Sequence, residues 1–348
     1  MTPADLSRAV LHAVRRAVDE DALRAPVPAR VRVERTRPGG RGDYACAVAL
    51  QLARPAALPA RDVAEIIRER VRGVPGIGVV EVTGPGFLNF SLSDGADRIG
   101  ALVRDIGESG REYGYGHALA GTAVSFAPVE EARALVVTEV VERLLRAQGA
   151  TVGARAAGGE SLHVMPVPAA DRDLCARLGN DAARWALLRA APHDRPQDTG
   201  GDALLAQRED NALFRVRYAY ARTRALSRNA RQLGFTSEYE MYESTGHGLR
   251  HAPADRAEAV TDALAALLAD HPDVLAAAAR HREPDRVARQ LEAVARAFFD
   301  FHDGAPPLPV GDEKPSAAHR SRLALAEAAG TVLAGGLSLL GISAPEVL

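Results

Sequence analysis

Residues 208–231 read REDNALFRVRYAYARTRALSRNAR and predict one long helix rich in arginine. At about 100° per residue, four of its arginines fall within a narrow stripe on one helix face, with Tyr220 beside them. These four, called the arginine stripe below, are Arg217, Arg224, Arg228 and Arg231. The stretch therefore predicts a basic helix face that carries an aromatic ring.

This face has two interpretations, and the pattern leaves both open. Guanidinium groups fork onto phosphate oxygens, and a tyrosine ring stacks on an unpaired base, so the face fits RNA. A solvated face of a bundle helix, with its arginines paired to carboxylates of neighbouring helices, has the same pattern.

The helical pattern extends on both sides of this stretch, so residues 171–348 are predicted to form an all-helical domain. A helix is expected over residues 177–189, and later segments are apolar at helical spacing. These later segments are Ala254–Asp270, Pro272–Arg282, Pro284–Phe301 and Ala317–Leu340. We expect them to form a helical bundle.

The N-terminal part, residues 1–118, is predicted to be an α+β domain. Helices are expected at Ala4–Asp19, Asp43–Ala53 and Arg61–Val71, and a strand at Val31–Arg35. A hairpin is expected from Val79–Val82 and Phe87–Leu92, around a Gly-Pro-Gly turn. Helices covering one face of a small antiparallel sheet are the natural arrangement.

Between these two parts, residues 119–170 predict a short α/β module. The expected order is a strand at Thr122–Ala127, a helix at Val129–Gln148 and a strand at Ser161–Val167. A complete mononucleotide-binding half needs several βαβ units, so this stretch is too short for one. The expected fold class is thus an α+β N-terminal domain, a short α/β module and an all-α C-terminal bundle.

Charge and hydropathy limit the classes of partner. The formal net charge of −2 argues against binding of nucleic acid by bulk electrostatics, so local clusters must do any such binding. Residues 1–19 lack the apolar core of a signal peptide, and residues 323–340 are interrupted by Glu327 and by glycines. We expect a cytoplasmic protein without a membrane partner.

The two cysteines, Cys46 and Cys175, lie far apart and have no histidine at ligand spacing. We therefore expect no metal site, and we expect both thiols to be buried among apolar side chains.

Three further stretches read GDYACAVALQLAR at 42–54, GPGFLNF at 84–90 and GGLSLLGISAPE at 335–346. Together they resemble arginyl-tRNA synthetase, and the resemblance implies that the short α/β module is a remnant of a nucleotide-binding core. The first two resemble the N-terminal tRNA-binding domain of that family, and the third resembles the end of its helical anticodon-binding domain. The resemblance implies tRNA or a tRNA-like RNA as the partner.

In that family, the helix that contacts the anticodon loop carries a Tyr-x-x-Tyr-Ala-His-Ala-Arg pattern. Residues 215–222 keep Tyr218 and Arg222 but have Arg215 and Tyr220 in place of the first tyrosine and the histidine. An aromatic-x-Asn in the N-terminal domain resembles the reader of the tRNA D-loop. The candidate RNA contacts are Phe87, Asn89, Tyr44, Gln51, Arg215, Arg217, Tyr218, Tyr220, Arg222, Arg224, Arg228 and Arg231.

The catalytic signatures of the family are not found in the sequence. No His-x-Gly-His occurs, and Lys314 is the one lysine of the chain, so no paired lysines exist to hold a triphosphate. These observations predict a non-catalytic tRNA-binding relative without ATP or another cofactor. The alternative is a protein-interaction or regulatory scaffold with a protein partner, in which RNA binding is vestigial.

Overall fold

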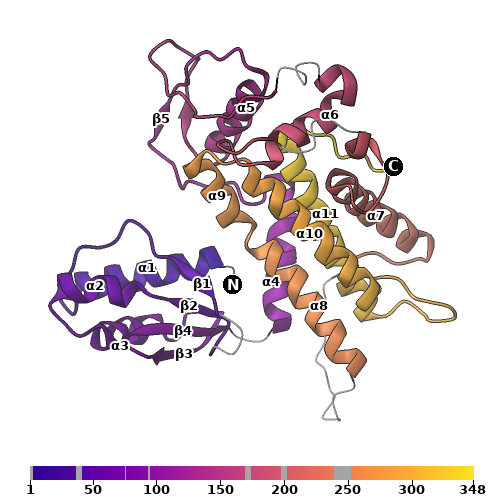
Figure 1. Cartoon of the computed structure of the whole chain (residues 1–348). Coiled ribbons are helices and arrows are strands. Elements are labelled where there is room, and N and C mark those ends of the chain that lie inside the picture. Colours follow the sequence, from indigo (N-terminus) through magenta and orange to yellow (C-terminus); the bar gives the residue numbers. More distant parts are fainter. Residues whose placement is uncertain are drawn as a thin grey trace. The chain divides into compact units, whose positions relative to one another are not determined.

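The computed structural model describes residues 3–36, 41–74, 76–92, 95–168, 174–196, 202–238 and 252–348. The chain separates into two compact units, Met1–Leu102 and Val103–Leu348 (Figure 1). The structure confirms the expected fold class, with a small sheet and helices in the first unit and a mostly helical second unit. The finer division at residues 118 and 170 stays a prediction.

The N-terminal unit contains a four-stranded antiparallel sheet in the order β1-β2-β4-β3. The strands are β1 (Val33–Arg35), β2 (Tyr44–Cys46), β3 (Ile77–Thr83) and β4 (Phe87–Leu92). The helices of this unit are α1 (Pro3–Asp19), α2 (Val48–Ala56) and α3 (Ala60–Val71). Leu88 and Phe90 of β4 are buried in one core with apolar residues of all three helices. The helices thus cover one face of the sheet, as expected.

One predicted helix of this unit was wrong at its start. Residues 43–53 do not form a single helix, because Tyr44–Cys46 is a strand and α2 begins only at Val48. In β2, Tyr44 pairs with Phe90 and Cys46 with Leu88. The period of two in this short stretch is the strand signal, and the helical spacing of the following residues hid it.

Helix α4 (Gly95–Ser109) was not predicted. It contains glycines at its start and at positions 100 and 107. Glycine disfavours a helix interior by about 1 kcal/mol relative to alanine, so the local sequence gives a weak helix signal.

The C-terminal unit contains a small α/β segment that follows α4 in the chain. Strands β5 (Ala123–Val124) and β6 (Thr151–Val152) pair in parallel, and α5 (Ala132–Ala147) connects them. The strand expected at Ser161–Val167 is absent. The backbone N–H groups of this stretch form hydrogen bonds outside any sheet. Met165 N–H donates to the Pro192 carbonyl, and Val167 N–H donates to the Glu131 carboxylate.

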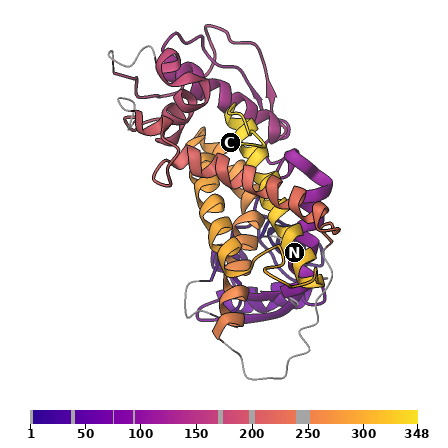
Figure 2. The same ribbon diagram turned by 90° about the vertical axis from the view of Figure 1, so that its right-hand side faces the viewer.

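The remaining elements that the structure describes in this unit are mainly helices (Figure 2). Its helices are α6 (Leu174–Arg189), α7 (Ala212–Gln232), α8 (Ala252–Ala269), α9 (His271–His281), α10 (Asp285–Gly304) and α11 (Ala317–Leu340). Helix α7 packs against both α10 and α11. Helix α11 is long and apolar enough to cross a membrane, but 83% of its most apolar 18-residue stretch is buried within the protein.

Candidate nucleic-acid interface

Helix α7 begins at Ala212 and not at Arg208, because Asn211 caps it. The side-chain oxygen of Asn211 accepts a hydrogen bond from Phe214 N–H at 3.2 Å. Its amide nitrogen donates to the carbonyls of Leu204 and Ala206, both at 2.8 Å. Asparagine is among the preferred N-cap residues. This one side chain therefore fixes the start of α7 against the preceding 3-10 turn η3 (Asp202–Leu205).

Three aromatic rings form a stack, called the ring column below, across α7 and α10. The Phe214 and Tyr218 ring centroids are 5.5 Å apart with planes at 7°, and those of Tyr218 and Phe299 are 5.6 Å apart at 22°. Tyr218 is 42% exposed, whereas its two neighbours are half-buried. The column thus presents one ring to solvent and packs it against two others.

Arginines of α7 flank the ring column on the α10 side. Arg215 and Arg222 lie three residues before and four residues after Tyr218, which places all three on one helix face. Arg215 donates to the Glu209 carbonyl at 2.7 Å, and an Arg222 nitrogen lies 3.3 Å from His302 Nε2. Neither arginine forms an ion pair with a carboxylate of the described residues. Both guanidinium groups therefore lack a neutralising carboxylate in the part of the chain that the structure describes.

The arginine stripe lies on the other flank and is partly occupied. Arg217 lies 3.8 Å from an oxygen of Asp181 and donates to the Ser343 hydroxyl at 3.4 Å. Arg224 pairs with Glu346 at 3.1 Å. The exposed Arg231 donates to the Ser227 carbonyl, and the half-exposed Arg228 forms no hydrogen bond or ion pair with the described part of the chain. Carboxylates of the protein thus hold two of the four arginines.

Tyr220 was wrongly expected on this surface. It is only 4% exposed, because it lies on the side of α7 that packs into the bundle. Arg217 and Arg224 lie close in angle to Tyr220 on the helix, and their long side chains still reach the surface. The most exposed ring of α7 is that of Tyr218.

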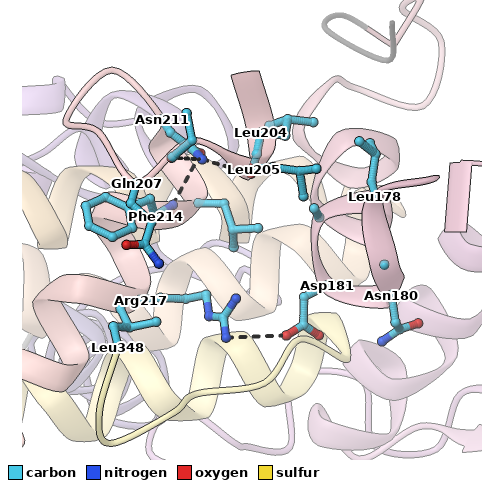
Figure 3. A pocket seen from close by; sticks show the side chains of 14 residues that line it. Leu178, Asn180, Asp181, Leu204, Leu205, Gln207, Asn211, Phe214, Arg217 and Leu348 are labelled. Carbon is cyan, nitrogen blue, oxygen red and sulfur yellow. Dashed lines mark hydrogen bonds and ion pairs between the residues drawn. The ribbon is translucent and has the colours of Figure 1, made fainter. Parts of the chain in front are cut away.

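A pocket of about 400 Å³ opens beside the ring column (Figure 3). Phe214 and Arg217 of α7 line it, together with residues at the kink of α6 and in η3. The kink lies at Gly179, whose φ of 75° is in the left-handed region that glycine adopts without strain. Figure 3 shows the Arg217–Asp181 ion pair at one end and the leucines of η3 at the other. The pocket therefore combines apolar walls with a charged end.

The candidates in the N-terminal unit divide into exposed and buried residues. Phe87 is 38% exposed and Gln51 is also exposed, whereas Asn89 is only 7% exposed and Tyr44 only 5%. Asn89 donates to the Thr83 hydroxyl at 2.6 Å. Tyr44 was wrongly expected as a surface residue, since it is part of the core. Phe87 and Gln51 keep the exposure that RNA contact requires.

Metal ligation finds no support in the residues that the structure describes. No three or more of their His, Cys, Asp and Glu side chains are grouped to hold an ion. Cys46 is buried, and burial raises its pKa to about 11, but Cys175 is exposed, contrary to expectation. The expected lack of a metal site stays a prediction.

Sequence reasoning missed Phe214, Phe299, Asp181 and Glu346. Phe214 could have been found, because it lies four residues before Tyr218 on the same helix face. The other three come from distant segments, and no local pattern connects them to α7.

Two family models match separate stretches of the chain. The one described as Arginyl tRNA synthetase N terminal domain matches residues 4–92, and the one described as DALR anticodon binding domain matches residues 216–348. The second match begins within α7 and includes the whole arginine stripe. The chain is an arginyl-tRNA synthetase-related protein.

Curated relatives of this synthetase-related protein are named Arginine--tRNA ligase. One from Renibacterium salmoninarum is 26% identical over an alignment of 561 residues, which covers 99% of this chain and 100% of the relative. One from Pseudarthrobacter chlorophenolicus is 38% identical over 50% of this chain and 30% of the relative. Because this chain has 348 residues, the longer alignment leaves many positions of the relative without a counterpart here.

Solved structures agree on the fold of this synthetase-related protein. Thermus thermophilus arginyl-tRNA synthetase superposes with a TM-score of 0.62 at 13% identity, over 100% of both chains. The Plasmodium falciparum arginyl-tRNA synthetase gives 0.59 at 10% identity, over 99% of both. At these identities the likeness shows the fold alone.

The expectation that this synthetase-related protein is not an enzyme is wrong by these comparisons. Relatives aligned over 99% of the chain carry the name of a ligase, which is an enzyme. The expectation rested on a missing histidine signature and on a single lysine. The missing signature and the single lysine exclude one way of holding the phosphates of ATP, but they do not exclude a ligase reaction. The expectation that ATP is not a partner therefore has no support either.

Proposed function

We propose that this protein binds tRNA, or a tRNA-like RNA, through the surface of α7 that contains the ring column and the flanking arginines. The exposed Tyr218 ring in the middle of a basic helix face is the observation that carries the proposal. Anticodon loops offer the two features that this surface suits, unpaired bases and closely spaced phosphates. The match of residues 216–348 to the anticodon binding domain supports the same surface.

The ring column suits base stacking because its exposed ring is already oriented. Tyr218 is held nearly parallel to Phe214, so little rotamer freedom remains to be lost when a base stacks on it. Base–aromatic stacking contributes about 1–3 kcal/mol per base. The adjoining pocket has apolar walls and the volume of a small-ligand site, so it offers space for a base turned away from the stack.

The arginines supply the electrostatic part of the interaction. The net charge of −2 gives no general attraction to RNA, so affinity has to come from local clusters. Arg215 and Arg222 flank Tyr218 on one side and the arginine stripe flanks it on the other. A strand whose base stacks on the ring therefore has guanidinium groups within reach of its phosphates on either side.

A tyrosine-to-alanine pair tests this proposal. Tyr218 and Tyr115 are both 42% exposed, but Tyr115 lies outside α7, so it serves as a matched control. We expect Tyr218→Ala to weaken binding of labelled total tRNA by about 5- to 150-fold, the equivalent of one lost base stack, and Tyr115→Ala to leave it unchanged. Titrations at two salt concentrations separate specific from bulk attraction. Lack of saturable binding at low salt, or equal affinities of the two variants, contradicts the proposal.

A second candidate function is ligation of arginine to tRNA, favoured by the full-length coverage of relatives named Arginine--tRNA ligase. The two candidates share the RNA-binding step and differ in the chemistry that follows. Incubation with ATP, labelled arginine and total tRNA distinguishes them. Acid-precipitable label above that of a heat-inactivated sample supports ligation, and label at that background with intact RNA binding contradicts it.

A further inference from the structure

Residues 341–348 follow α11 and lie along the arginine stripe of α7. Helix α11 ends at Leu340, and Gly341 takes the left-handed conformation with φ 72°. Ser343 N–H donates to Asp181 of α6 at 3.2 Å, and the Ser343 hydroxyl bonds the same carboxylate. Ile342 is only 4% exposed. The start of this segment is therefore firmly anchored.

Beyond Ser343 the segment is held more loosely. The Glu346 carboxylate pairs with Arg224 Nε at 3.1 Å, and their side chains are 55% and 41% exposed. The following Val347 is 73% exposed. Exposed ion pairs contribute little to stability, because water and salt screen them. The contact between Glu346 and Arg224 can therefore be exchanged for another at small cost.

We propose that Glu346 occupies a phosphate-binding position on Arg224 and that the RNA backbone displaces it. A guanidinium group binds carboxylate and phosphate oxygens through the same N–H donors, so the two ligands compete for one site. Arg224 lies between Arg217 and Arg228 on the stripe, so a backbone that contacts its neighbours meets the Glu346 carboxylate there. Segment 343–348 is thus a built-in competitor of RNA at the arginine stripe.

The same segment also touches the pocket beside the ring column. Leu348 lines that pocket together with Phe214 and Arg217, as Figure 3 shows. Release of Glu346 from Arg224 frees the loosely held residues after Ser343, including Leu348. A phosphate on Arg224 and a base in the pocket therefore favour the same rearrangement, and RNA displaces the segment at both points together.

This inference rests on the proposed function, and Glu346→Gln tests it. The substitution keeps the size of the side chain and removes the charge that holds Arg224. Glu108 is an exposed glutamate of α4 that forms no ion pair with the described residues, so Glu108→Gln makes the same change in net charge as a control. We expect Glu346→Gln to tighten binding of labelled tRNA at low salt by about two- to fivefold, the scale of an exposed ion pair, and Glu108→Gln to change it less. Equal effects of the two variants, or weaker binding by Glu346→Gln, overturn the inference.

A double-mutant cycle with Arg224→Ala gives a second measurement. If Glu346 competes with RNA for Arg224, loss of the arginine costs more RNA affinity in the Glu346→Gln chain than in the unaltered chain. Equal costs overturn the competition. Failure of the proposed function has a different result, because the unaltered chain and Glu346→Gln then both lack saturable binding. Binding that depends on Tyr218 but ignores Glu346 refutes only the competition.

Discussion

The ring of Tyr218 in α7 lies against the ring of Phe299 in α10, with centroids 5.6 Å apart and planes at 22°. The adjacent Phe298 is fully buried, and its ring meets that of Phe299 edge-on at 5.4 Å. Two consecutive phenylalanines thus have different surroundings, one in the ring column and one in the bundle core.

We expect alanine at these two positions to have separable effects. Phe299→Ala removes the ring that backs Tyr218, so tRNA affinity should fall about two- to tenfold, the value of one aromatic pair. Phe298→Ala opens a cavity in the core and should lower the free energy of unfolding by about 3–5 kcal/mol. Urea unfolding and tRNA titration of both variants check this. If tRNA affinity falls in both variants only in proportion to the loss of unfolding free energy, the ring column has no role in binding.

The placement of Phe299 shows what the sequence could not predict. Helix α10 was predicted from its apolar spacing, and its bounds were found to within a few residues. Which of its residues meets Tyr218 depends on how α7 and α10 pack, and no local pattern encodes that. The same holds for Glu346 and Arg224, which are far apart in the sequence and adjacent in the structure.

Local signals failed where tertiary contacts override them. Tyr44–Cys46 became a strand because its neighbours in the sheet, β1 and β4, supply backbone partners on both sides. Tyr220 was expected beside the arginine stripe because helical spacing gives an angle and not a depth. Tyr220 lies on the edge of α7 that packs against the bundle, so its side chain is buried. The longer side chains of the nearby arginines extend from the same edge to solvent.

Arg133 of α5 is expected to be essential for stability. It is completely buried, and its guanidinium donates to the carbonyl of Met165 and to carbonyls at and after the C-terminal end of α6. The acceptors are Met165, Leu187, Ala190, Ala191, Pro192 and Asp194. Burial lowers the pKa of Arg133, whereas the charges of Glu131 and Asp194 oppose this shift.

Lysine cannot replace this arginine, because its ammonium has three donors in place of five. Arg133→Lys leaves buried carbonyls without a donor, so we expect the free energy of unfolding to fall by at least about 2 kcal/mol. Arg146→Lys, at an exposed position of the same helix, serves as the control and should change it by less than about 0.5 kcal/mol. Urea denaturation measures both, and a change at Arg133 as small as that at Arg146 refutes the structural role.

Asn89 in β4 is expected to act mainly as a structural residue. Its amide donates to the Thr83 hydroxyl across the β3–β4 hairpin, and it is only 7% exposed. Asn89→Ala removes a buried hydrogen bond and should cost about 1–2 kcal/mol. Gln51→Ala, at an exposed position in α2, should stay within about 0.5 kcal/mol. Thermal unfolding of both variants checks this; weaker tRNA binding by Asn89→Ala at unchanged stability favours a reader of bases there.

His271 at the start of α9 is predicted to make the C-terminal unit sensitive to acid. It is 1% exposed and stacks on Tyr113, and its Nδ1 lies 2.7 Å from the Gln290 side-chain oxygen. Gln290 donates its own amide to the Leu267 carbonyl, so its oxygen is the acceptor and the imidazole is the donor. Burial lowers the pKa of His271 to about 4, although the hydrogen bond to Gln290 opposes this shift.

The sign of the pH effect follows from proton binding. Above the ordinary histidine pKa of about 6.5, both the folded and the unfolded chain hold the neutral imidazole, and His271 gives no pH dependence. As the pH falls from there towards the lowered value, only the unfolded chain takes up the proton, so folding stability decreases by up to about 1.4 kcal/mol per unit. Asp273 acts in the opposite direction, because burial raises its pKa and the folded chain takes up that proton first.

A comparison with His271→Gln isolates the histidine. We expect urea unfolding between pH 7 and pH 4.5 to show a steeper loss of stability in the unaltered chain than in this variant, and parallel pH profiles contradict the assignment.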